Sequence, residues 1–180
     1  MGVAFSRNLG ITTSKGDYLC FLDSDDIWDL NKIQKQLIFM LSNAYSFSYT
    51  YYTTFDKNLK KKLLYKLPNF VKYQTLLFGN CIPLSSVMLK RDSIGNLRFQ
   101  KIGHEDYLFW LMYLKKNNYG FLLNENLMFY RIHSNSISYN KYKAISFTWK
   151  IYRSQLKFNF LISLFYFTIH IIRAVIKRYF

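Results

Sequence analysis

The sequence has few of the residues that break a chain or cross-link it. Its 180 residues include only 2 prolines, 7 glycines and 2 cysteines, while 51% are hydrophobic. This composition excludes a disordered or low-complexity chain, and the length suffices for one domain with a core. Cys20 and Cys81 cannot build the disulfide framework of a small secreted protein. Neither a secretory signal nor an internal repeat is visible, so we expect a reducing, cytoplasmic compartment.

Acidic residues are scarce as well. The chain has 10 Asp and Glu against 25 Lys and Arg, which gives a net charge of +15. Residues 141–180 carry no acidic side chain, and a second basic cluster lies within residues 57–72. Such a surplus of positive charge suits an anionic partner: a nucleotide, an anionic lipid or a nucleic acid. The alternative is that these side chains are solvated and only aid solubility. No nucleic-acid-binding motif is visible, so we expect no nucleic-acid partner.

A hydrophobic run long enough to span a bilayer is also missing. The longest candidate, Phe158 to Ile172, has no charged residue and is bounded by Lys157 and Arg173. It is shorter than the ~20 residues that a transmembrane helix needs. A basic-flanked apolar helix that lies in the membrane interface fits this pattern, and a helix of the core is the alternative.

Strands and helices alternate irregularly along the chain, which predicts an α/β fold. The unbroken apolar run at 18–22 indicates a strand covered on both faces, as in a parallel sheet. Residues 29–42 are predicted as an amphipathic helix, because Leu30, Ile33, Leu37, Ile38 and Leu41 recur at helical spacing. The other predicted helices cover 3–15, 70–78, 104–116 and 139–157; the other strands cover 45–53, 83–89, 120–123 and 126–130, with a loop or hairpin at 56–66 and a polar loop at 131–138.

Three carboxylates, Asp23, Asp25 and Asp26, directly follow the apolar run in the stretch FLDSDDIW. In open α/β sheets, ligands bind beyond the carboxyl ends of the strands. Hard carboxylate oxygens held close together suit Mg²⁺ or Mn²⁺. The alternative is that Asp23 or Ser24 caps the next helix and the other acids are solvated.

Two later stretches carry further candidate groups. In GHEDYLFW, Glu105 and Asp106 fall in the first turn of a helix, where a carboxylate can serve as a general base or can simply favour the helix dipole. In YRIHSNSIS, Arg131 can clamp a diphosphate and His133 can ligate a metal. Taken alone, His133 is better explained as an ordinary surface or core histidine.

The combination and order of these segments resembles the family-2 glycosyltransferases of the GT-A fold, from about Val3 to Arg153. The most specific match is GVAFSRNLGITTSKGDYLCFLDSDDIW. The resemblance implies a GT-A-like (Rossmann-like) mixed sheet flanked by helices over residues 1–157, followed by the C-terminal amphipathic helix at 158–180. Members of this family usually begin some tens of residues earlier, so the resemblance also implies an N-terminally truncated chain without the first nucleotide-binding segment.

The resemblance assigns roles to individual residues. By this resemblance the metal ligands are Asp25, Asp23 and His133. The catalytic base is Asp106, and Glu105 lies beside it in the sequence. The donor contacts are Asp23, Asp26, Arg7 and Arg131. The acceptor side is a looser match in the segment from Asn80 to Ser86, and takes in Ser85, Ser86 and His104.

The implied activity is inverting transfer of a sugar from a nucleotide-sugar donor, UDP-linked, to a hydroxyl of a glycan or lipid-linked acceptor. Mg²⁺ or Mn²⁺ would assist, and the enzyme would act in cell-surface polysaccharide synthesis as a peripheral protein at the inner face of the cell membrane. Three alternatives stay open: an inactive remnant that only binds the membrane surface, a basic nucleic-acid-binding protein, and a phosphatase with Asp23 as nucleophile. The last lacks the Gly-Thr pair that such enzymes carry after the second acid, because Asp26-Ile27 stands there.

Overall fold

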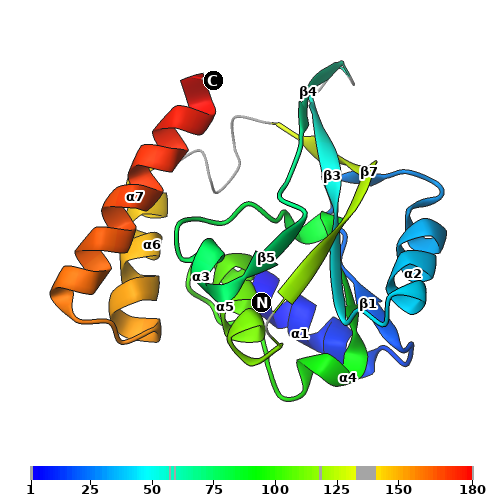
Figure 1. Ribbon diagram of the computed structural model, residues 1–180, viewed down its shortest axis with the longest axis horizontal. Coiled ribbons are helices and arrows are strands. Elements are labelled where there is room, and N and C mark those ends of the chain that lie inside the picture. The colour runs from blue at the N-terminus through cyan, green and yellow to red at the C-terminus, as the bar shows by residue number, and fades with distance from the viewer. Residues whose placement is uncertain (1, 57, 59, 118, 133–140, 180) are drawn as a thin grey trace.

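The computed structural model describes residues 2–56, 58, 60–117, 119–132 and 141–179 (Figure 1). The helices are α1 (Val3–Thr13), α2 (Lys32–Ser42), α3 (Tyr73–Leu76), α4 (Arg91–Ile94), α5 (Glu105–Asn117), α6 (Lys141–Lys150) and α7 (Phe160–Tyr179), with a 3-10 turn η1 (Leu84–Ser86) and a π-helical turn η3 (Ile151–Gln155). The strands are β1 (Tyr18–Cys20), β2 (Ile27–Trp28), β3 (Phe47–Phe55), β4 (Lys61–Tyr65), β5 (Phe70–Lys72), β6 (Met88–Lys90) and β7 (Tyr119–Arg131).

These strands form one mixed sheet in the order β1-β6-β3-β7-β2, with β4 added to β3 and β5 added to β7. Only the central pair, β3 with β7, runs parallel among the described strands. Figure 1 shows α2 on one side of the sheet and α3 and α5 on the other. The predicted α/β class with a mixed, helix-flanked sheet is confirmed.

The first predicted strand is wrong in its partner and in its length. β1 spans three residues and pairs antiparallel with β6, with Leu19 opposite Leu89. Only Leu19 is buried among its residues, and Leu22 is 49% exposed. An apolar run indicates burial, but it does not give the direction of the neighbouring strand.

The face that α2 buries is also not the predicted one. Leu30, Ile33, Ile38 and Leu41 of the predicted apolar stripe are exposed, whereas Lys32 and Gln36 are fully buried. Under the helix, the Gln36 amide donates to Ser48 Oγ on β3 and to the Ser86 backbone oxygen. Buried polar groups need such partners, and this requirement overrides the apolar pattern here.

Several boundaries differ from the prediction for local reasons. The segment 70–78 is strand β5 followed by α3, because the Thr75 hydroxyl accepts from the Lys72 backbone N–H and starts the helix at Tyr73. The segment 83–89 is the turn η1 followed by β6, and 141–155 is α6 followed by η3. The two strands predicted at 120–123 and 126–130 form one strand, β7, whose register against β3 shifts near Asn126. The hairpin option for 56–66 is confirmed by the antiparallel pairing of β3 with β4.

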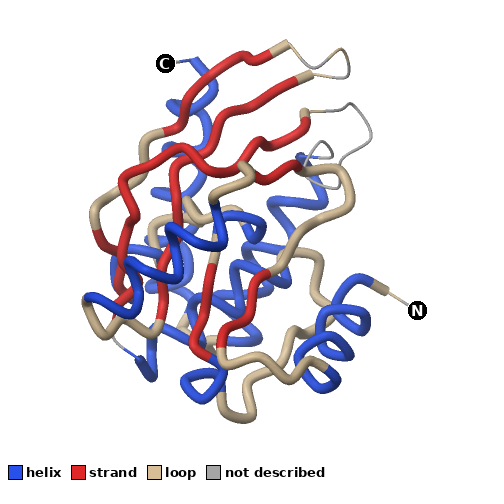
Figure 2. Tube along the Cα trace, turned by 90° about the vertical axis from the view of Figure 1, so that its right-hand side faces the viewer, coloured by secondary structure: helices blue, strands red, loops and turns tan. Residues whose placement is uncertain are grey.

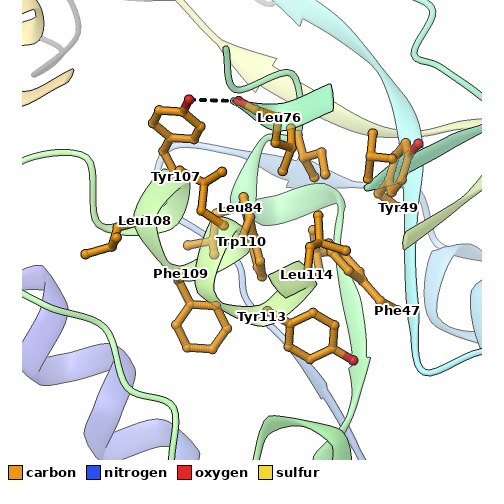
Figure 3. Close-up of a cluster of buried hydrophobic side chains, with 14 of the residues drawn as sticks. Phe47, Tyr49, Leu76, Leu84, Tyr107, Leu108, Phe109, Trp110, Tyr113 and Leu114 are labelled. Carbon is orange, nitrogen blue, oxygen red and sulfur yellow. Dashed lines mark hydrogen bonds between the residues drawn. The ribbon is translucent and has the colours of Figure 1, made fainter. Parts of the chain in front are cut away.

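Helix α5 packs its apolar side chains into the largest cluster of the core (Figure 3). Trp110 is fully buried with its ring 5.3 Å from that of Phe47 on β3. Gly120 on β7 allows this approach, since a Cβ there would lie 2.8 Å from the Phe47 ring. Dense packing holds α5 in one position, and its first turn, which carries Glu105 and Asp106, is fixed with it.

The C-terminal helix α7 packs through one side and exposes the other. Ser163 is fully buried, and Tyr166 and Phe167 pack against the core cluster. The outer side consists of exposed apolar residues: Phe160, Leu161, Leu164, Phe165 and Ile172. In the part of the chain that the structure describes, no helix has the length and hydropathy required to cross a membrane.

Candidate active site

A cavity of about 1060 Å³ lies where the loop after β1, helix α1, the segment before η1 and the start of α5 meet. A volume of roughly 300–1,000 Å³ is typical of ligand sites. Its lining includes Arg7 of α1, the acid loop 23–26 and the segment 103–107, as well as His170 of α7. Elements from both ends of the chain therefore build one site.

The acid loop, residues 23–26, is held by η1. The Asp23 backbone N–H donates to Ser85 Oγ at 3.1 Å, and the Ser85 hydroxyl donates to Asp26 Oδ2 at 2.6 Å. The Trp28 indole N–H donates to the Ser85 backbone oxygen at 2.6 Å. Ser85 is thus a central anchor of the loop, which explains why a serine lies buried beneath three carboxylates.

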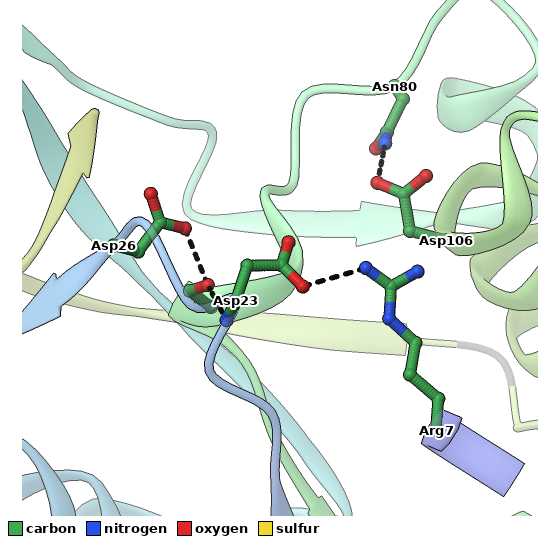
Figure 4. A network of polar contacts seen from close by, with 6 residues as sticks. Arg7, Asp23, Asp26, Asn80 and Asp106 are labelled. Atoms are coloured by element: carbon green, nitrogen blue, oxygen red, sulfur yellow. Dashed lines mark hydrogen bonds and ion pairs between the residues drawn. The ribbon is translucent and has the colours of Figure 1, made fainter. Parts of the chain in front are cut away.

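Asp26 is nearly buried, and its carboxylate holds the acid loop in place (Figure 4). Its Oδ1 accepts from the Arg131 backbone N–H at 3.2 Å, and the Arg131 Nε donates to the Asp25 backbone oxygen at 2.9 Å. Burial raises the pKa of Asp26 to about 6, against the lowering effect of its hydrogen bonds. The Arg131 guanidinium also lies 4.6 Å from the ring of Phe55 on β3. Through its contacts with Asp25, Asp26 and Phe55, Arg131 connects β7 to the acid loop and to β3.

Asp23 is paired with a cation from the first helix. The Arg7 Nη2 lies 2.8 Å from Asp23 Oδ1, and the Arg7 side chain is 14% exposed (Figure 4). The Arg7 guanidinium also lies 5.4 Å from the Phe99 ring, which fixes it from behind. A partly buried charge pair of this kind is stronger than a surface pair and orients the carboxylate.

Asp106 lies in the wall of the same cavity, in the first turn of α5. The Asn80 side-chain amide donates to its Oδ2 at 3.0 Å (Figure 4). Burial raises the pKa of Asp106, while a hydrogen bond from the Tyr107 backbone and the charges of His104 and Arg7 act in the opposite direction. A carboxylate of raised pKa, held by neutral donors, has the properties of a general base.

The structure brings most of the predicted site residues together. Asp23, Asp25, Asp26, Arg7, His104, Glu105 and Asp106 all line the cavity. Ser85 and Ser86 are buried beneath the acid loop, where Ser86 donates to the Pro83 backbone oxygen. His133 lies outside the described residues. Within the described ranges, no three acidic, His or Cys side chains gather as a metal site.

Sequence reasoning missed His170, a polar residue within the apolar tail. Its ring lies 5.9 Å from that of Tyr107, and a Cβ added to Gly79 would lie 3.4 Å from its Nδ1. Burial and the charge of His104 lower its pKa to about 4, so the ring is neutral at pH 7. The only sequence signal for this position was a polar residue on the packed side of an apolar helix.

Comparison with known proteins agrees with the geometry of the site. Residues 1–160 match the family model described as Glycosyl transferase family 2. This chain belongs to glycosyltransferase family 2. The chain is 35% identical over 180 residues to TuaG of Bacillus subtilis, named as a candidate teichuronic acid biosynthesis glycosyltransferase, and the match covers 98% of this chain and 71% of TuaG.

A second family-2 relative has a more specific name. WfaP of Escherichia coli, a UDP-Glc:alpha-D-GlcNAc-diphosphoundecaprenol beta-1,3-glucosyltransferase, is 36% identical over 146 residues, which cover 80% of this chain and 57% of WfaP. The crystal structure of Staphylococcus aureus TarS residues 1–349 with UDP-GlcNAc superposes with a TM-score of 0.61 at 13% identity, over 83% of this chain and 46% of that one. The fold is that of the GT-A glycosyltransferases, and the chain spans only part of each of these proteins.

Proposed function

We propose that this family-2 protein catalyses inverting transfer of a sugar from a UDP-linked donor to a hydroxyl of a lipid-linked glycan, in cell-surface polysaccharide synthesis. One observation carries the proposal: the Asp106 carboxylate, held by Asn80, lines the same cavity as Asp23 and Asp25. A base on one wall of a cavity and an acid loop that can hold a divalent cation on another are an arrangement suited to displacement at an anomeric carbon. TuaG and WfaP support the choice of pathway, and WfaP and the TarS complex support the UDP donor.

In this proposal, Asp106 accepts the proton of the acceptor hydroxyl. The hydroxyl oxygen forms a bond to the anomeric carbon, and the bond from that carbon to the nucleoside diphosphate breaks on the opposite face. The raised pKa of Asp106 brings its basicity closer to neutral pH, where a general base is most effective. Glu105 has a different role, because its Oε1 accepts from the Gly103 backbone N–H and fixes the turn before α5.

The acid loop has the chemistry for a divalent cation shared with the donor diphosphate. Mg²⁺ is commonly bound by one or two carboxylates with substrate phosphates completing the coordination, so a set of three protein ligands is not required. We assign Asp25 and Asp23 to Mg²⁺ or Mn²⁺, because Asp26 is engaged with Ser85 and Arg131. When bound, the cation supplies charge stabilisation for the departing diphosphate. Arg7 orients Asp23 for this task.

The acceptor and the membrane are assigned to the side of the cavity bordered by α7. WfaP acts on a diphosphoundecaprenol-linked sugar, which resides in a bilayer. The outer side of α7 presents Phe160, Leu161, Leu164 and Phe165 to solvent, and the sequence ends in a basic stretch. Such a helix suits the interface of an anionic leaflet. We therefore place the protein at the inner face of the cell membrane, with residues 158–180 as a membrane-binding element attached to a catalytic domain at 1–157.

Two variants and one control test the chemistry. Asp106→Asn should lower transfer to a diphosphate-lipid-linked GlcNAc acceptor by about 10²–10⁴-fold and leave Mn²⁺-dependent UDP binding unchanged in calorimetry. Asp25→Ala should weaken that UDP binding. Glu125→Gln, which alters a surface carboxylate paired with Lys35, should change neither quantity. If Asp106→Asn lost binding and transfer equally, the base assignment would be wrong.

Vesicle binding without transfer or nucleotide binding would favour the alternative, a membrane-bound remnant. If UDP bound without metal and still bound to Asp25→Ala, the assignment of a divalent cation to Asp25 and Asp23 would be wrong. The assignment of Asp106 as the base would not be affected. The three parts of the proposal therefore fail separately.

A further inference from the structure

The hairpin of β3 and β4 carries a basic and apolar surface that the catalytic proposal does not use. We call the exposed residues Lys60, Lys61, Lys62, Leu63, Leu64 and Lys66 the hairpin surface. Leu63 is 52% exposed and Leu64 is 45% exposed, although both belong to a regular strand. β4 pairs only with β3 among the described strands, so its other edge faces outward.

Asp56 supplies the negative charge of the hairpin, against four lysines of the hairpin surface. The sequence has no acidic residue between Asp56 and Asp92. Asp56 itself is occupied by the turn, because its Oδ1 accepts from the backbone N–H groups of Asn58 and Lys60. Those bonds, with the nearby lysines, hold the pKa of Asp56 below its usual range, so it remains a carboxylate of the turn. One carboxylate cannot offset four lysines, so the hairpin surface keeps a net positive charge that an external anion can meet.

The composition of this surface selects the kind of anion. Lysines around exposed leucines match the interface of an anionic bilayer, where each cation near the surface contributes attraction and the apolar side chains enter the headgroup boundary. A nucleic-acid surface would instead present aromatic rings for stacking or side chains that reach base edges. Tyr65, the aromatic residue of β4, is half-buried and already stacks on Tyr52, so it does not present a free ring to a base.

The hairpin and α7 border the same cavity. Tyr65, at the end of β4, lines the cavity and stacks on Tyr52 with ring centroids 4.8 Å apart. His170 lines it from α7. Figures 1 and 2, which share their vertical axis, show the outer end of strand β4 and the C-terminal end of α7 at the same end of the molecule.

We propose that the hairpin surface is a second membrane contact, so that the protein rests on an anionic bilayer through both α7 and the β3–β4 hairpin. This inference extends the membrane association in the proposed function, and it requires neither nucleotide binding nor transfer. Two contacts on either side of one cavity orient that cavity toward the lipid surface. A single contact through α7 would leave rotation about that helix free.

The test is sedimentation of the full chain with vesicles of phosphatidylcholine, with and without phosphatidylglycerol. The triple variant Lys60→Gln, Lys62→Gln, Lys66→Gln should lower partitioning onto the anionic vesicles by about 10- to 100-fold, since each lysine near such a surface contributes on the order of 1 kcal/mol. The control triple Lys15→Gln, Lys90→Gln, Lys115→Gln removes the same charge from exposed lysines elsewhere and should change it by about twofold or less.

A second pair of changes addresses the apolar part. Leu63→Ser with Leu64→Ser should weaken binding even in high salt, where lysine attraction is screened. Equal partitioning of the hairpin and control triples would overturn the inference. Loss of binding only on changing the α7 residues Leu161 and Leu164 to serine would leave α7 as the contact and remove the hairpin. Loss of DNA binding in the hairpin triple, with vesicle binding intact, would replace the bilayer by nucleic acid.

Discussion

A buried lysine on α2, Lys32, leads to a quantitative prediction about the stability of the fold. Lys32 on α2 is fully buried, and its Nζ donates to Gln36 Oε1 at 2.7 Å and lies 4.5 Å from the Trp28 ring. It makes no salt bridge among the described residues. Burial lowers its pKa from 10.5 to about 8, partly offset by the coulombic effect of Cys20. We predict that Lys32→Met stabilises the fold at pH 7.

The magnitude follows from the pKa. At 1.36 kcal/mol per pH unit, the difference between 10.5 and about 8 corresponds to a cost of about 3 kcal/mol for the charged native state. Methionine removes this cost, but it also removes the cation–π contact and leaves the buried Gln36 Oε1 without its donor, together about 1–2 kcal/mol. The expected net gain is about 1–2 kcal/mol at pH 7.

The pH dependence of the free energy of unfolding provides a second test of the Lys32→Met prediction. Between pH 8 and pH 10.5 the unfolded chain binds a proton at Lys32 that the native chain does not, so wild-type stability rises with pH across this window. The advantage of Lys32→Met should therefore shrink from pH 7 to pH 9.5 in urea unfolding followed by circular dichroism. Lys35→Met, on the exposed side of the same helix, should stay within about 0.5 kcal/mol at both values. A Lys32→Met variant less stable than wild type, by an amount that does not depend on pH, would refute the reasoning.

Two further predictions concern the cavity wall. His170 has a pKa of about 4 in the native state and 6.5 when unfolded, so wild-type stability is lost as the pH falls from about 6.5 to 4; His170→Gln should lose less over that range, by up to about 3 kcal/mol, in the same unfolding assay. A parallel pH profile for the two proteins would show that the ring is not buried as described. Gly103→Ala should lower the free energy of unfolding by about 1–3 kcal/mol, because its φ is +94° and a Cβ would overlap the Phe147 ring. Gly2→Ala, where a Cβ meets open space, serves as its control in thermal melts.

The candidate site was more predictable from the sequence than the sheet was. The acids at 23–26 and at 105–106 are marked by local context, a strand end and a helix start, and the structure brings both to one cavity. The resemblance also assigned Arg7 to the donor site, but it did not predict the ion pair of Arg7 with Asp23. Local spacing carries this information because each group is positioned by its own element.

The features that were not predicted depend on distant partners. Nothing near Tyr18 indicates that its strand lies antiparallel to β6, seventy residues later. The buried face of α2 was misassigned because Gln36 is paired with Ser48 and the Ser86 backbone, which no periodicity reveals. His170 reaches the cavity only because η3 and α6 turn the chain back. Such tertiary contacts override local pattern.

The parallel pairing of β3 with β7 also determines the order of events during synthesis. Ser48 lies opposite Phe121, and Phe55 lies opposite Arg131, so β3 must wait for more than seventy residues before its central partner exists. At 5–20 residues per second, that delay is roughly 4–15 s on the ribosome. During this time the aromatic strand FSYTYYTTF has an unpaired edge, which is the kind of segment that aggregates. We expect the nascent chain to depend on a chaperone until β7 has emerged, and cavity assembly to finish only with the arrival of α7.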